Sequence, residues 1–371
     1  MTTPHPLRIL LLSGYHAASH RYWCDGLMRE LGQYHWTLLS LPARHFSWRL
    51  RGNPLSWLSE QAALLNAPYD LVIATSAVDV ATLRGLVPSL ARLPWLLYMH
   101  ENQFAYPRSA RQHPGVDAQM VNLYAALSAD RVLFNSGYNR DSFLAGANAL
   151  LSRLPDHRPR AIEPLLSAKS GVLSVPLDDS LKGYKRQPAD QFTLCWNHRW
   201  EYDKGPQRLL LTLRQLKAQR VPFRLHLLGE QFRQQPQPLL ELQREFAQQL
   251  GQVGFVDQRE RYYQLLSESH LVLSNSLHEF QGLAVLEAVA LGSLPRVPAR
   301  LSYPELFPDC CYPGDEQDEI AEAENLAAVI AADFERFSTA GLPAAPSVAE
   351  LFWSALKPAY AAEIESLVRP I

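Results

Sequence analysis

A segment near residue 280 combines two glutamates and a glycine at the point where an apolar run is followed by a helical pattern. The segment reads HEFQGLAVLEAVALG, carries Glu279, Gly282 and Glu287, and follows the apolar run at 271–276. A helix that begins near Gly282 would direct unpaired backbone N–H groups and the positive end of its dipole toward a phosphate beyond the strand. A carboxylate beside that helix start suits the hydroxyl groups of a ribose or a sugar. The segment therefore indicates a site for a sugar nucleotide.

Two alternatives exist for the glutamates. They could be the acid and nucleophile of a glycoside hydrolase, but eight helical residues span roughly 12 Å, whereas such carboxyl pairs stand about 5–9.5 Å apart. They could also have no catalytic role, with Glu279 favoured by the helix dipole and Glu287 solvated. The segment alone does not decide between this second alternative and the sugar-nucleotide site.

Two cations follow another apolar run, FTLCWNH at 192–198. Arg199 comes directly after it, and Lys204 and Gly205 precede the amphipathic pattern PQRLLLTLRQLKAQR. Ligands of an open α/β sheet bind outside the carboxyl ends of its strands, so both cations should face the ligand. Arginine offers a planar fork to phosphate oxygens and lysine a compact charge. Either residue alone could be a solvated surface charge, but together they favour stabilisation of a leaving diphosphate.

Length and pattern predict an α/β protein with parallel sheets. The chain has 371 residues, of which 47% are hydrophobic and 19% charged, which is enough for two buried cores. Apolar runs alternate with helical patterns throughout, as expected for parallel strands joined by crossover helices. We expect strands at 7–13, 36–42, 70–76, 94–100, 131–136, 171–176, 192–198, 223–229, 252–256, 271–276 and 294–298.

The same pattern predicts two domains. We expect an N-terminal Rossmann-like domain at 1–176, a polar linker at 177–191 and a C-terminal Rossmann-like domain at 192–345. The final segment, 346–371, has apolar residues at helical spacing and contains Pro358, which should kink it. We expect this helix to cross back to the N-terminal domain, because its apolar stripe needs a partner.

Cysteines and apolar segments indicate a cytoplasmic protein with no membrane partner. The four cysteines have no C-x-x-C spacing, and adjacent Cys310 and Cys311 are poor disulfide partners, so we expect reduced thiols. The N-terminal LRILLLS is too short for a membrane span, and no other apolar run reaches that length.

Charge is unevenly distributed along the chain. The net charge is −2, but the first 180 residues carry 16 Lys and Arg against 13 Asp and Glu, and eight of the twelve histidines. This bias permits a polyanionic acceptor on the N-terminal domain, although such arginines also suit solvated faces. The arginine clusters are Arg44, Arg49 and Arg51; Arg108 and Arg111; and Arg153, Arg158 and Arg160.

Several of these motifs resemble those of GT-B glycosyltransferases. The R-x4-K-G after 192–198, the Gly254–Phe255 pair and the E-x7-E segment resemble the family 4 retaining enzymes. SGYHAASHRYW, LYMHENQFAYP, FNSGYNRDSF and WNHRWEYDKGP resemble the narrower family of tRNA-queuosine α-mannosyltransferases. The resemblance spans nearly the whole chain and implies a GT-B fold, in which two Rossmann-like domains face a central cleft.

The resemblance also implies roles for individual residues. On the donor side, the cations would bind the diphosphate, Glu279 the transferred sugar and Glu287 the ribose. On the acceptor side, His100 would face the sugar, and the loop that opens the first helix would approach the acceptor or the phosphates, although Ser19 could simply be an N-cap. The implied catalytic residues are Arg199, Lys204, Glu279 and His100. The implied donor-binding residues are Gly254, Gly282, Leu283 and Glu287. The implied acceptor-binding residues are Gly14, Tyr15, Ser19, His20, Glu101, Asn102, Arg108 and Arg111.

The implied reaction is retaining transfer of mannose from GDP-mannose to the cyclopentenediol of queuosine in a tRNA anticodon, with tRNA-Asp as the expected acceptor. The chain contains no D-x-D triplet, so we expect no metal and no cofactor, with cations and a helix dipole in the metal's place. The resemblance favours front-face attack in which the leaving phosphate accepts the acceptor proton, while a double displacement stays open.

Two other functions stay open. One is a cytoplasmic retaining glycosyltransferase that uses another nucleotide sugar and a glycan, lipid or small-molecule acceptor. The other is a non-catalytic GT-B protein that binds tRNA or a nucleotide sugar, against which the intact set of Arg199, Lys204, Glu279 and Glu287 argues.

Overall fold

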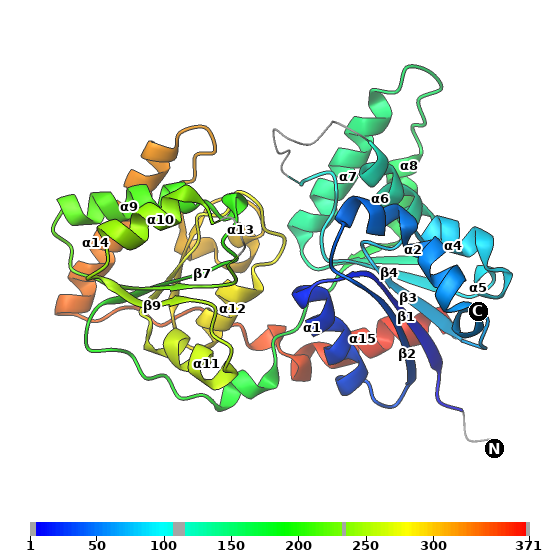
Figure 1. Cartoon of the computed structure of the whole chain (residues 1–371), viewed down its shortest axis with the longest axis horizontal. Helices are drawn as coiled ribbons and strands as arrows, with labels where there is room; N and C mark the ends of the chain where they lie inside the picture. The colour runs from blue at the N-terminus through cyan, green and yellow to red at the C-terminus, as the bar shows by residue number, and fades with distance from the viewer. Residues whose placement is uncertain (1–4, 107–115, 232–234, 369–371) are drawn as a thin grey trace. The chain divides into compact units, whose positions relative to one another are not determined.

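The structure is a computed structural model that describes residues 5–106, 116–231 and 235–368. It contains two compact units (Figure 1): unit 1 comprises Met1–Pro176 and Trp353–Ile371, and unit 2 comprises Leu177–Phe352. Each unit has one six-stranded sheet in which all the pairings are parallel, with helices on both faces. The expected α/β class with two Rossmann-like sheets is confirmed.

Unit 1 has the strand order β2-β1-β3-β4-β5-β6. The chain leaves β1 for the edge strand β2 and returns to β3 on the other side of β1, so the order reverses between β1 and β3. The central strands are buried on both faces, which explains their continuous apolar sequences. The strands are β1 Arg8–His16, β2 His35–Pro42, β3 Leu71–Thr75, β4 Trp95–Met99, β5 Arg131–Phe134 and β6 Ser170–Val172.

The helices of unit 1 connect these strands and cover the sheet. They are α1 Ala18–Glu30, α2 Phe46–Glu60, α3 Ala62–Leu65, α4 Val80–Leu86, α5 Pro88–Ala91, α6 Asp117–Ser128, α7 Gly137–Ser152, α8 Ile162–Ala168 and the C-terminal α15 Trp353–Val368.

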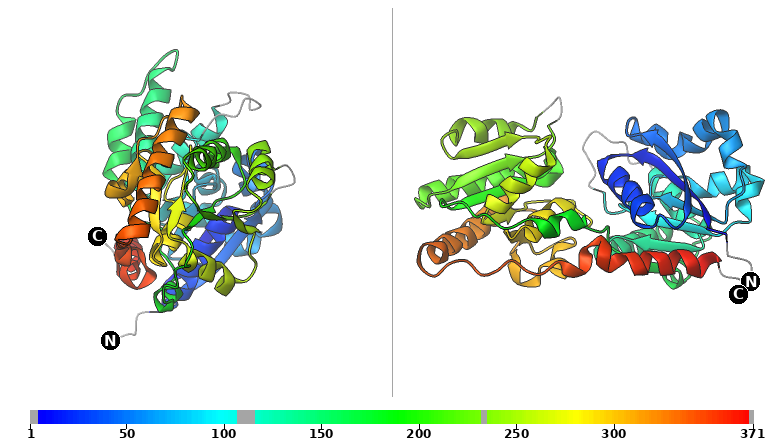
Figure 2. Two further views of the ribbon diagram at one scale, coloured as in Figure 1. Left: turned by 90° about the vertical axis from the view of Figure 1, so that its left-hand side faces the viewer. Right: turned by 90° about the horizontal axis from the view of Figure 1, so that it is seen from below.

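Helix α15 packs within unit 1, although it is the last element of the chain (Figure 2). The indole of Trp23 in α1 donates a hydrogen bond of 3.0 Å to the Tyr360 hydroxyl, and Arg131 at the start of β5 forms an ion pair of 2.7 Å with Glu363. A Cβ on Gly26 would lie 2.6 Å from the ring of Trp353, so this glycine allows α1 to approach α15 closely. Aromatic packing and an ion pair therefore fasten the last helix to unit 1.

Unit 2 has the strand order β12-β11-β10-β7-β8-β9, which reverses between β7 and β10. Its strands are β7 Thr193–Asn197, β8 Arg224–Leu228, β9 Leu250–Gly254, β10 Leu271–Leu273, β11 Leu294–Pro298 and β12 Cys311–Tyr312. Its helices are α9 Pro206–Ala218, α10 Gln237–Glu245, α11 Arg259–Glu268, α12 Leu283–Ala290, α13 Tyr303–Leu306 and α14 Glu319–Thr339, with 3-10 turns η1 Asp179–Gly183, η2 Tyr202–Lys204, η3 Pro308–Cys310 and η4 Ala349–Leu351.

All eleven predicted strands are present, and β12 was not predicted because a two-residue edge strand has no periodicity to detect. The segment 177–191 is not a free linker: Leu177 and Leu181 are buried in the core of unit 2, and Leu177 pairs with Phe352 in an isolated bridge. The segment packs on unit 2 because burial of its few apolar side chains, removed from water, is favourable. Unit 2 accordingly extends over 177–352 rather than 192–345.

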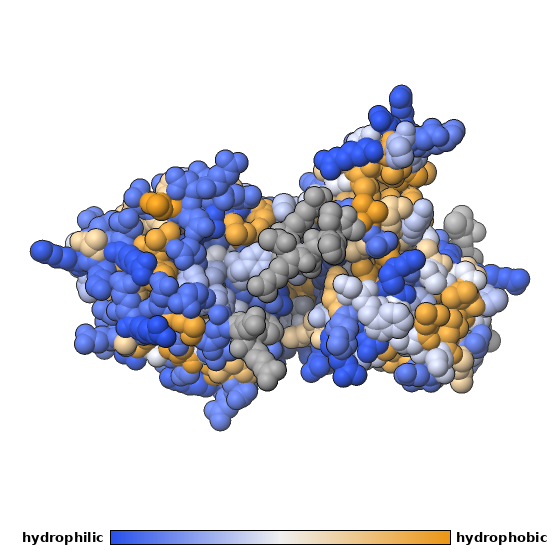
Figure 3. Space-filling model, turned by 45° about the horizontal axis from the view of Figure 1, so that its top comes forward, coloured by the Kyte–Doolittle hydropathy of each residue, from blue (hydrophilic) through white to orange (hydrophobic). Residues whose placement is uncertain are grey.

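The cysteines, the helices and the surface bear on the environment of the protein. The four cysteines are free, and Cys24, Cys195 and Cys310 are buried. Among the helices that the structure describes, none is long and apolar enough to cross a membrane. On the face in Figure 3, the surface of unit 2 is mainly hydrophilic, whereas hydrophobic residues gather on unit 1.

Candidate functional site

The loops that follow β7 and β10 meet at the carboxyl edge of the unit 2 sheet. These adjacent strands flank the reversal of strand order, where open α/β sheets bind their ligands. Gly205 has a φ of +69°, and a Cβ on it would lie 2.2 Å from the Asn275 carbonyl oxygen. The backbone N–H of Leu277 also donates to the Asp203 carbonyl at 2.7 Å. The glycine therefore lets the two loops touch, which carries Lys204 to the segment that holds Glu279.

Lys204 is almost buried, and its ammonium lies against carboxylate and carbonyl oxygens. Its side chain is 8% exposed, and Nζ lies 3.2 Å from Asp203 Oδ2 and 3.4 Å from Glu279 Oε2. Nζ also donates to the His278 carbonyl oxygen at 2.7 Å. Burial lowers the pKa of Lys204, but the attraction of Glu279 and Asp203 outweighs it and the net shift is upward. The site therefore keeps a fixed positive charge at neutral pH.

Glu279 is the anionic partner of this lysine. Burial raises the pKa of Glu279, but Lys204, followed by His198 and His278, outweighs burial and lowers that pKa to about 2. The side chain keeps 21% of its surface exposed, and Oε1 accepts a 3.1 Å hydrogen bond from the backbone N–H of Phe280. An ionised, partly exposed carboxylate is suited to accept hydrogen bonds from the hydroxyl groups of a sugar.

The helix that the sequence predicts after Gly282 is confirmed as α12, which begins at Leu283. Gly282 is its N-cap, has a φ of +80° and offers no side chain to the first turn. A Cβ on Gly282 would lie 3.1 Å from the ring of Tyr303. The first N–H groups of a helix have no intrahelical acceptor, so this end can bind a phosphate.

Glu287 lies one turn along α12 and is held by a tyrosine that sequence reasoning missed. The Tyr262 hydroxyl donates to Glu287 Oε2 at 2.9 Å and accepts from Asn197 Nδ2 at 3.1 Å. Burial raises the pKa of Glu287 to about 7, against the hydrogen bond from Tyr262. Asn197 is the last residue of β7 and also donates to the Ala284 carbonyl at 2.7 Å. This chain of hydrogen bonds sets the direction of the Glu287 carboxyl group.

Arg199 and Gly254, two other residues predicted to bind the donor, lie at different distances from Lys204 in the sheet. Arg199 follows β7 as expected, is 50% exposed and lies 3.0 Å from Glu201, and its charge acts on the pKa of Lys204. Gly254 ends β9, the strand farthest from β10 on that side of β7, and a Cβ on it would meet the Gln231 side chain at 2.9 Å. Arg199 therefore lies close enough to Lys204 for their charges to interact, whereas β8 separates Gly254 from β7 in the sheet.

A second cluster lies at the carboxyl edge of the unit 1 sheet. His20 Nε2 lies 3.0 Å from Glu101 Oε2, and the Ser76 hydroxyl donates to Glu101 Oε1 at 2.7 Å. The His20 ring stacks on that of His100 with a centroid distance of 4.2 Å. Burial raises the pKa of Glu101, but His20, His100 and Ser76 outweigh it and lower that pKa to about 2. The residues come from the segments after β1, β3 and β4, which the reversal of strand order brings together.

His100 has unused hydrogen-bonding capacity. It is only 6% exposed, and by hydrogen-bond geometry neither ring nitrogen has a partner among the residues that the structure describes. Burial, followed by the charge of His20, holds the pKa of His100 well below its ordinary value, so the ring is neutral. Most buried polar groups have a partner, and a neutral imidazole with two free nitrogens is suited to a ligand hydroxyl.

Asn102 is hydrogen-bonded within the loop that follows β4. Asn102 is fully buried, its amide donates to Asn139 and Ser142, and its Oδ1 accepts from the backbone of Phe104 and Ala105. All of its polar atoms are thus used to hold the loop after β4. Asn102 thus supports the loop that carries Glu101, and its contribution to acceptor binding stays a prediction.

The other residues predicted to bind the acceptor differ in their surroundings. A Cβ on Gly14 would lie 2.7 Å from the Ala77 carbonyl oxygen, so this glycine lets the end of β1 approach the segment after β3. Tyr15 is partly buried, with its ring 5.2 Å from that of Phe46. Ser19 is exposed in the first turn of α1, and the N-cap is Ala17, so the alternative N-cap role of Ser19 is wrong. Arg108 and Arg111 lie outside the described residues.

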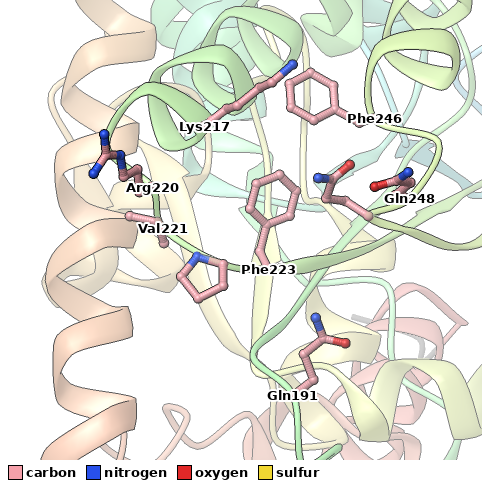
Figure 4. Close-up of a pocket in the computed structure, with 9 residues that line it drawn as sticks. Gln191, Lys217, Arg220, Val221, Phe223, Phe246 and Gln248 are labelled. Atoms are coloured by element: carbon pink, nitrogen blue, oxygen red, sulfur yellow. The ribbon is translucent and has the colours of Figure 1, made fainter.

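A cavity of about 390 Å³ lies elsewhere in unit 2 (Figure 4). Its lining residues precede β7, β8 and β9 in the chain, so it opens at the amino edge of the sheet, opposite the edge that carries Lys204. It is not part of the candidate site. The lining residues are Gln191, Lys217, Arg220, Val221, Pro222, Phe223, Phe246, Gln248 and Gln249.

Family models match both units. The model described as tRNA-queuosine alpha-mannosyltransferase N-terminal matches residues 8–177, and the model of glycosyl transferases group 1 matches residues 180–305. A tRNA-queuosine alpha-mannosyltransferase of Drosophila melanogaster is 32% identical over 315 residues, which cover 82% of this chain and 82% of the relative.

Solved structures share the fold at low sequence identity. The Anabaena protein HepE in complex with UDP and glucose is 17% identical with a TM-score of 0.68, over 97% of this chain and 100% of that one. A sucrose-phosphate synthase from Thermosynechococcus elongatus is 16% identical with a TM-score of 0.69, over 97% of this chain and 99% of that one. Such structures are GT-B glycosyltransferases, which confirms the predicted fold class.

Proposed function

Because this chain belongs to the tRNA-queuosine alpha-mannosyltransferase family, we propose that it transfers mannose from GDP-mannose to the cyclopentenediol of queuosine in a tRNA anticodon. The chain is a glycosyltransferase, and both units carry family motifs. The observation that carries the proposal is the contact of buried Lys204 with Glu279 beside the uncapped start of α12.

In this proposal unit 2 binds the nucleotide sugar. The diphosphate lies against Lys204, Arg199 and the first N–H groups of α12, where positive charge and unpaired donors coincide. Glu279 accepts hydrogen bonds from the hydroxyl groups of the mannose. Glu287, directed by Tyr262, accepts them from the ribose.

Catalysis is retaining and uses no divalent ion. As the bond between the sugar C1 and the phosphate oxygen breaks, negative charge develops on GDP, and Lys204 and Arg199 stabilise it. The acceptor oxygen forms the new bond to C1 on the face that the phosphate leaves, and a phosphate oxygen takes its proton. The cationic residues support this route, and chelation of divalent ions then leaves the rate unchanged.

Unit 1 binds the acceptor. The free nitrogens of His100, in a cluster with His20 and Glu101, suit a hydroxyl of the cyclopentenediol. The basic bias of the first half of the chain suits tRNA, and tRNA-Asp as the particular acceptor rests on the family resemblance. Four free thiols support a cytoplasmic location.

The test is release of nucleotide from GDP-mannose in the presence of matched tRNAs. The same tRNA is prepared with queuosine and with guanosine at that position, and GDP is quantified after incubation with the protein. We expect GDP release that depends on queuosine. Release with both tRNAs alike, or only with another nucleotide sugar such as UDP-glucose, would contradict the proposed acceptor or donor.

A further inference from the structure

A long stretch of unit 1 contains no acidic residue. Residues 31–59 lack Asp and Glu, but include His35, His45, Arg44, Arg49 and Arg51. The stretch spans β2 and nearly all of α2. Its cations gather at 44–51, where the chain leaves the carboxyl end of β2 and enters α2. Arg44 and His45 are exposed, whereas Arg51 forms an ion pair of 2.9 Å with Asp79.

The same segment exposes an indole that rests on its own helix. Trp48 in the first turn of α2 is 54% exposed. A Cβ on Gly52, four residues later, would lie 2.6 Å from Cε2 of the Trp48 ring. The ring therefore lies against the helix backbone at Gly52, and a glycine is needed for it to do so. A rigidly backed, exposed aromatic ring beside arginines is how proteins stack unpaired nucleic acid bases and bind their phosphates.

The segment 44–52 lies at the same edge of the sheet as the cluster of His20, His100 and Glu101. The ring of Phe46, at the start of α2, contacts that of Tyr15 at the end of β1. Asn53 Nδ2 donates to the Ala77 carbonyl at 3.1 Å, and Ala77 follows β3. The amino-terminal half of α2 is thus fastened to the carboxyl ends of two strands, beside the strand after which His100 lies.

We propose that Trp48 and Arg44 form a platform for the tRNA anticodon loop, with Trp48 stacked on an unpaired base and Arg44 on a phosphate. This inference rests on the proposed function, because the ligand is the RNA substrate. A membrane is a poorer partner, because Leu50, Pro54 and Trp57 of α2 are buried in unit 1. Only Trp48 and Leu55 among its large apolar side chains are exposed, which is too small an apolar face for a helix that lies in a bilayer.

The first experiment separates stacking from charge. Binding of a fluorescein-labelled anticodon stem-loop RNA that carries queuosine is measured by anisotropy with the full chain at several KCl concentrations. Trp48→Ala should weaken binding about tenfold, as expected for one lost stacking contact, with no change in salt dependence. Arg44→Ala should lower the slope of log K against log salt by about 0.7–0.9. Arg92→Ala, an exposed arginine before β4 at the opposite edge, is the matched control and should leave both unchanged.

A second variant moves the indole and keeps every charge. In Gly52→Ala the new methyl group occupies the place of the Trp48 ring, so RNA binding should weaken by about as much as in Trp48→Ala. Alanine favours the helix more than glycine does, so the melting temperature should not fall. Weaker binding with an unchanged or higher melting temperature separates loss of the platform from loss of the fold.

Three results would overturn the inference. Wild-type RNA affinity in both Trp48→Ala and Gly52→Ala would show that the platform does not contact RNA. Binding of the wild type to phosphatidylserine vesicles that Trp48→Ala abolishes, with RNA binding intact, would make the platform a membrane contact. A wild-type protein that neither binds the stem-loop nor modifies the tRNA would overturn the proposed function along with the platform, whereas an active wild type with unaffected variants overturns the platform alone.

Discussion

Lys204 Nζ lies 3.4 Å from Glu279 Oε2, although 75 positions separate the two residues in the chain. The contact exists because β7 and β10 are neighbours in the unit 2 sheet and because Gly205 has no side chain to keep their loops apart. It joins a fixed cation for a phosphate to an ionised carboxylate for a sugar. The chemistry that we propose for unit 2 depends on this pair.

Replacing either cation should slow transfer. Lys204→Ala and Arg199→Ala should each reduce the rate at saturating substrates by about 100-fold or more, because each removes positive charge from the leaving diphosphate. Arg199→Lys should recover little activity, because an ammonium cannot reproduce the guanidinium fork. Initial rates of GDP formation provide the measurement.

Lys217→Ala is the control for these substitutions, since Lys217 is half-exposed on α9 and pairs with Glu245 away from the site. It should retain the wild-type rate. A rate close to wild type in Lys204→Ala, in protein that melts as the wild type does, would remove Lys204 from the phosphate site.

Tyr262 and Tyr263, adjacent on α11, provide a test variant and its matched control. Tyr262→Phe removes the hydrogen bond to Glu287 and should weaken GDP binding about fivefold, the effect of about 1 kcal/mol. Tyr263→Phe removes a hydroxyl that contacts Arg259 instead and should leave GDP binding unchanged. Isothermal titration calorimetry of both variants checks this, and equal affinities would mean that Tyr262 does not position Glu287.

His100→Phe separates a ligand contact from a packing role. Phenylalanine keeps a ring for stacking on His20 but has no nitrogen, so transfer should fall about 100-fold, within the range for a lost hydrogen bond in the transition state. The melting temperature should hold or rise, because the buried nitrogens of His100 have no partner among the described residues. Activity close to wild type in His100→Phe would mean that His100 packs in the protein but does not contact a substrate.

Donor binding should depend on pH through Glu287. Burial raises the pKa of Glu287 to about 7, so the group is mostly protonated below that pH and ionised above it. Ribose hydroxyls donate hydrogen bonds, which favours the ionised form. The affinity for GDP-mannose, whose phosphates do not titrate in this range, should therefore rise about tenfold from pH 6 to pH 8. Glu287→Gln should flatten the profile, and a pH-independent wild type would contradict the role of Glu287.

The sequence predicts the parts of this protein that depend on local pattern. Apolar runs locate the strands, and the rule that ligands lie at the carboxyl ends of parallel strands brings Lys204 and Glu279 to one edge. The start of α12 follows from Gly282, which can adopt the φ of +80° found there.

What the sequence does not show depends on tertiary contacts. Tyr262 and Tyr263 are adjacent and chemically identical, and only the packing of α11 decides which of them meets Glu287. Asn102 lies inside a motif that suggests a ligand, yet its amide is used entirely by the loop around it. The segment 177–191 is polar overall, and the burial of Leu177 becomes visible only in the folded unit.

The central claim is tested most directly by mass spectrometry of tRNA nucleosides. A tRNA that carries queuosine is incubated with the protein and GDP-mannose, digested, and compared with a reaction that contains Lys204→Ala. We predict that the queuosine signal gives way to a species heavier by one hexose, which releases mannose on acid hydrolysis, and that the variant forms it at about 1% of the wild-type rate or less. Unmodified queuosine after prolonged incubation with fully folded wild-type protein would contradict the account.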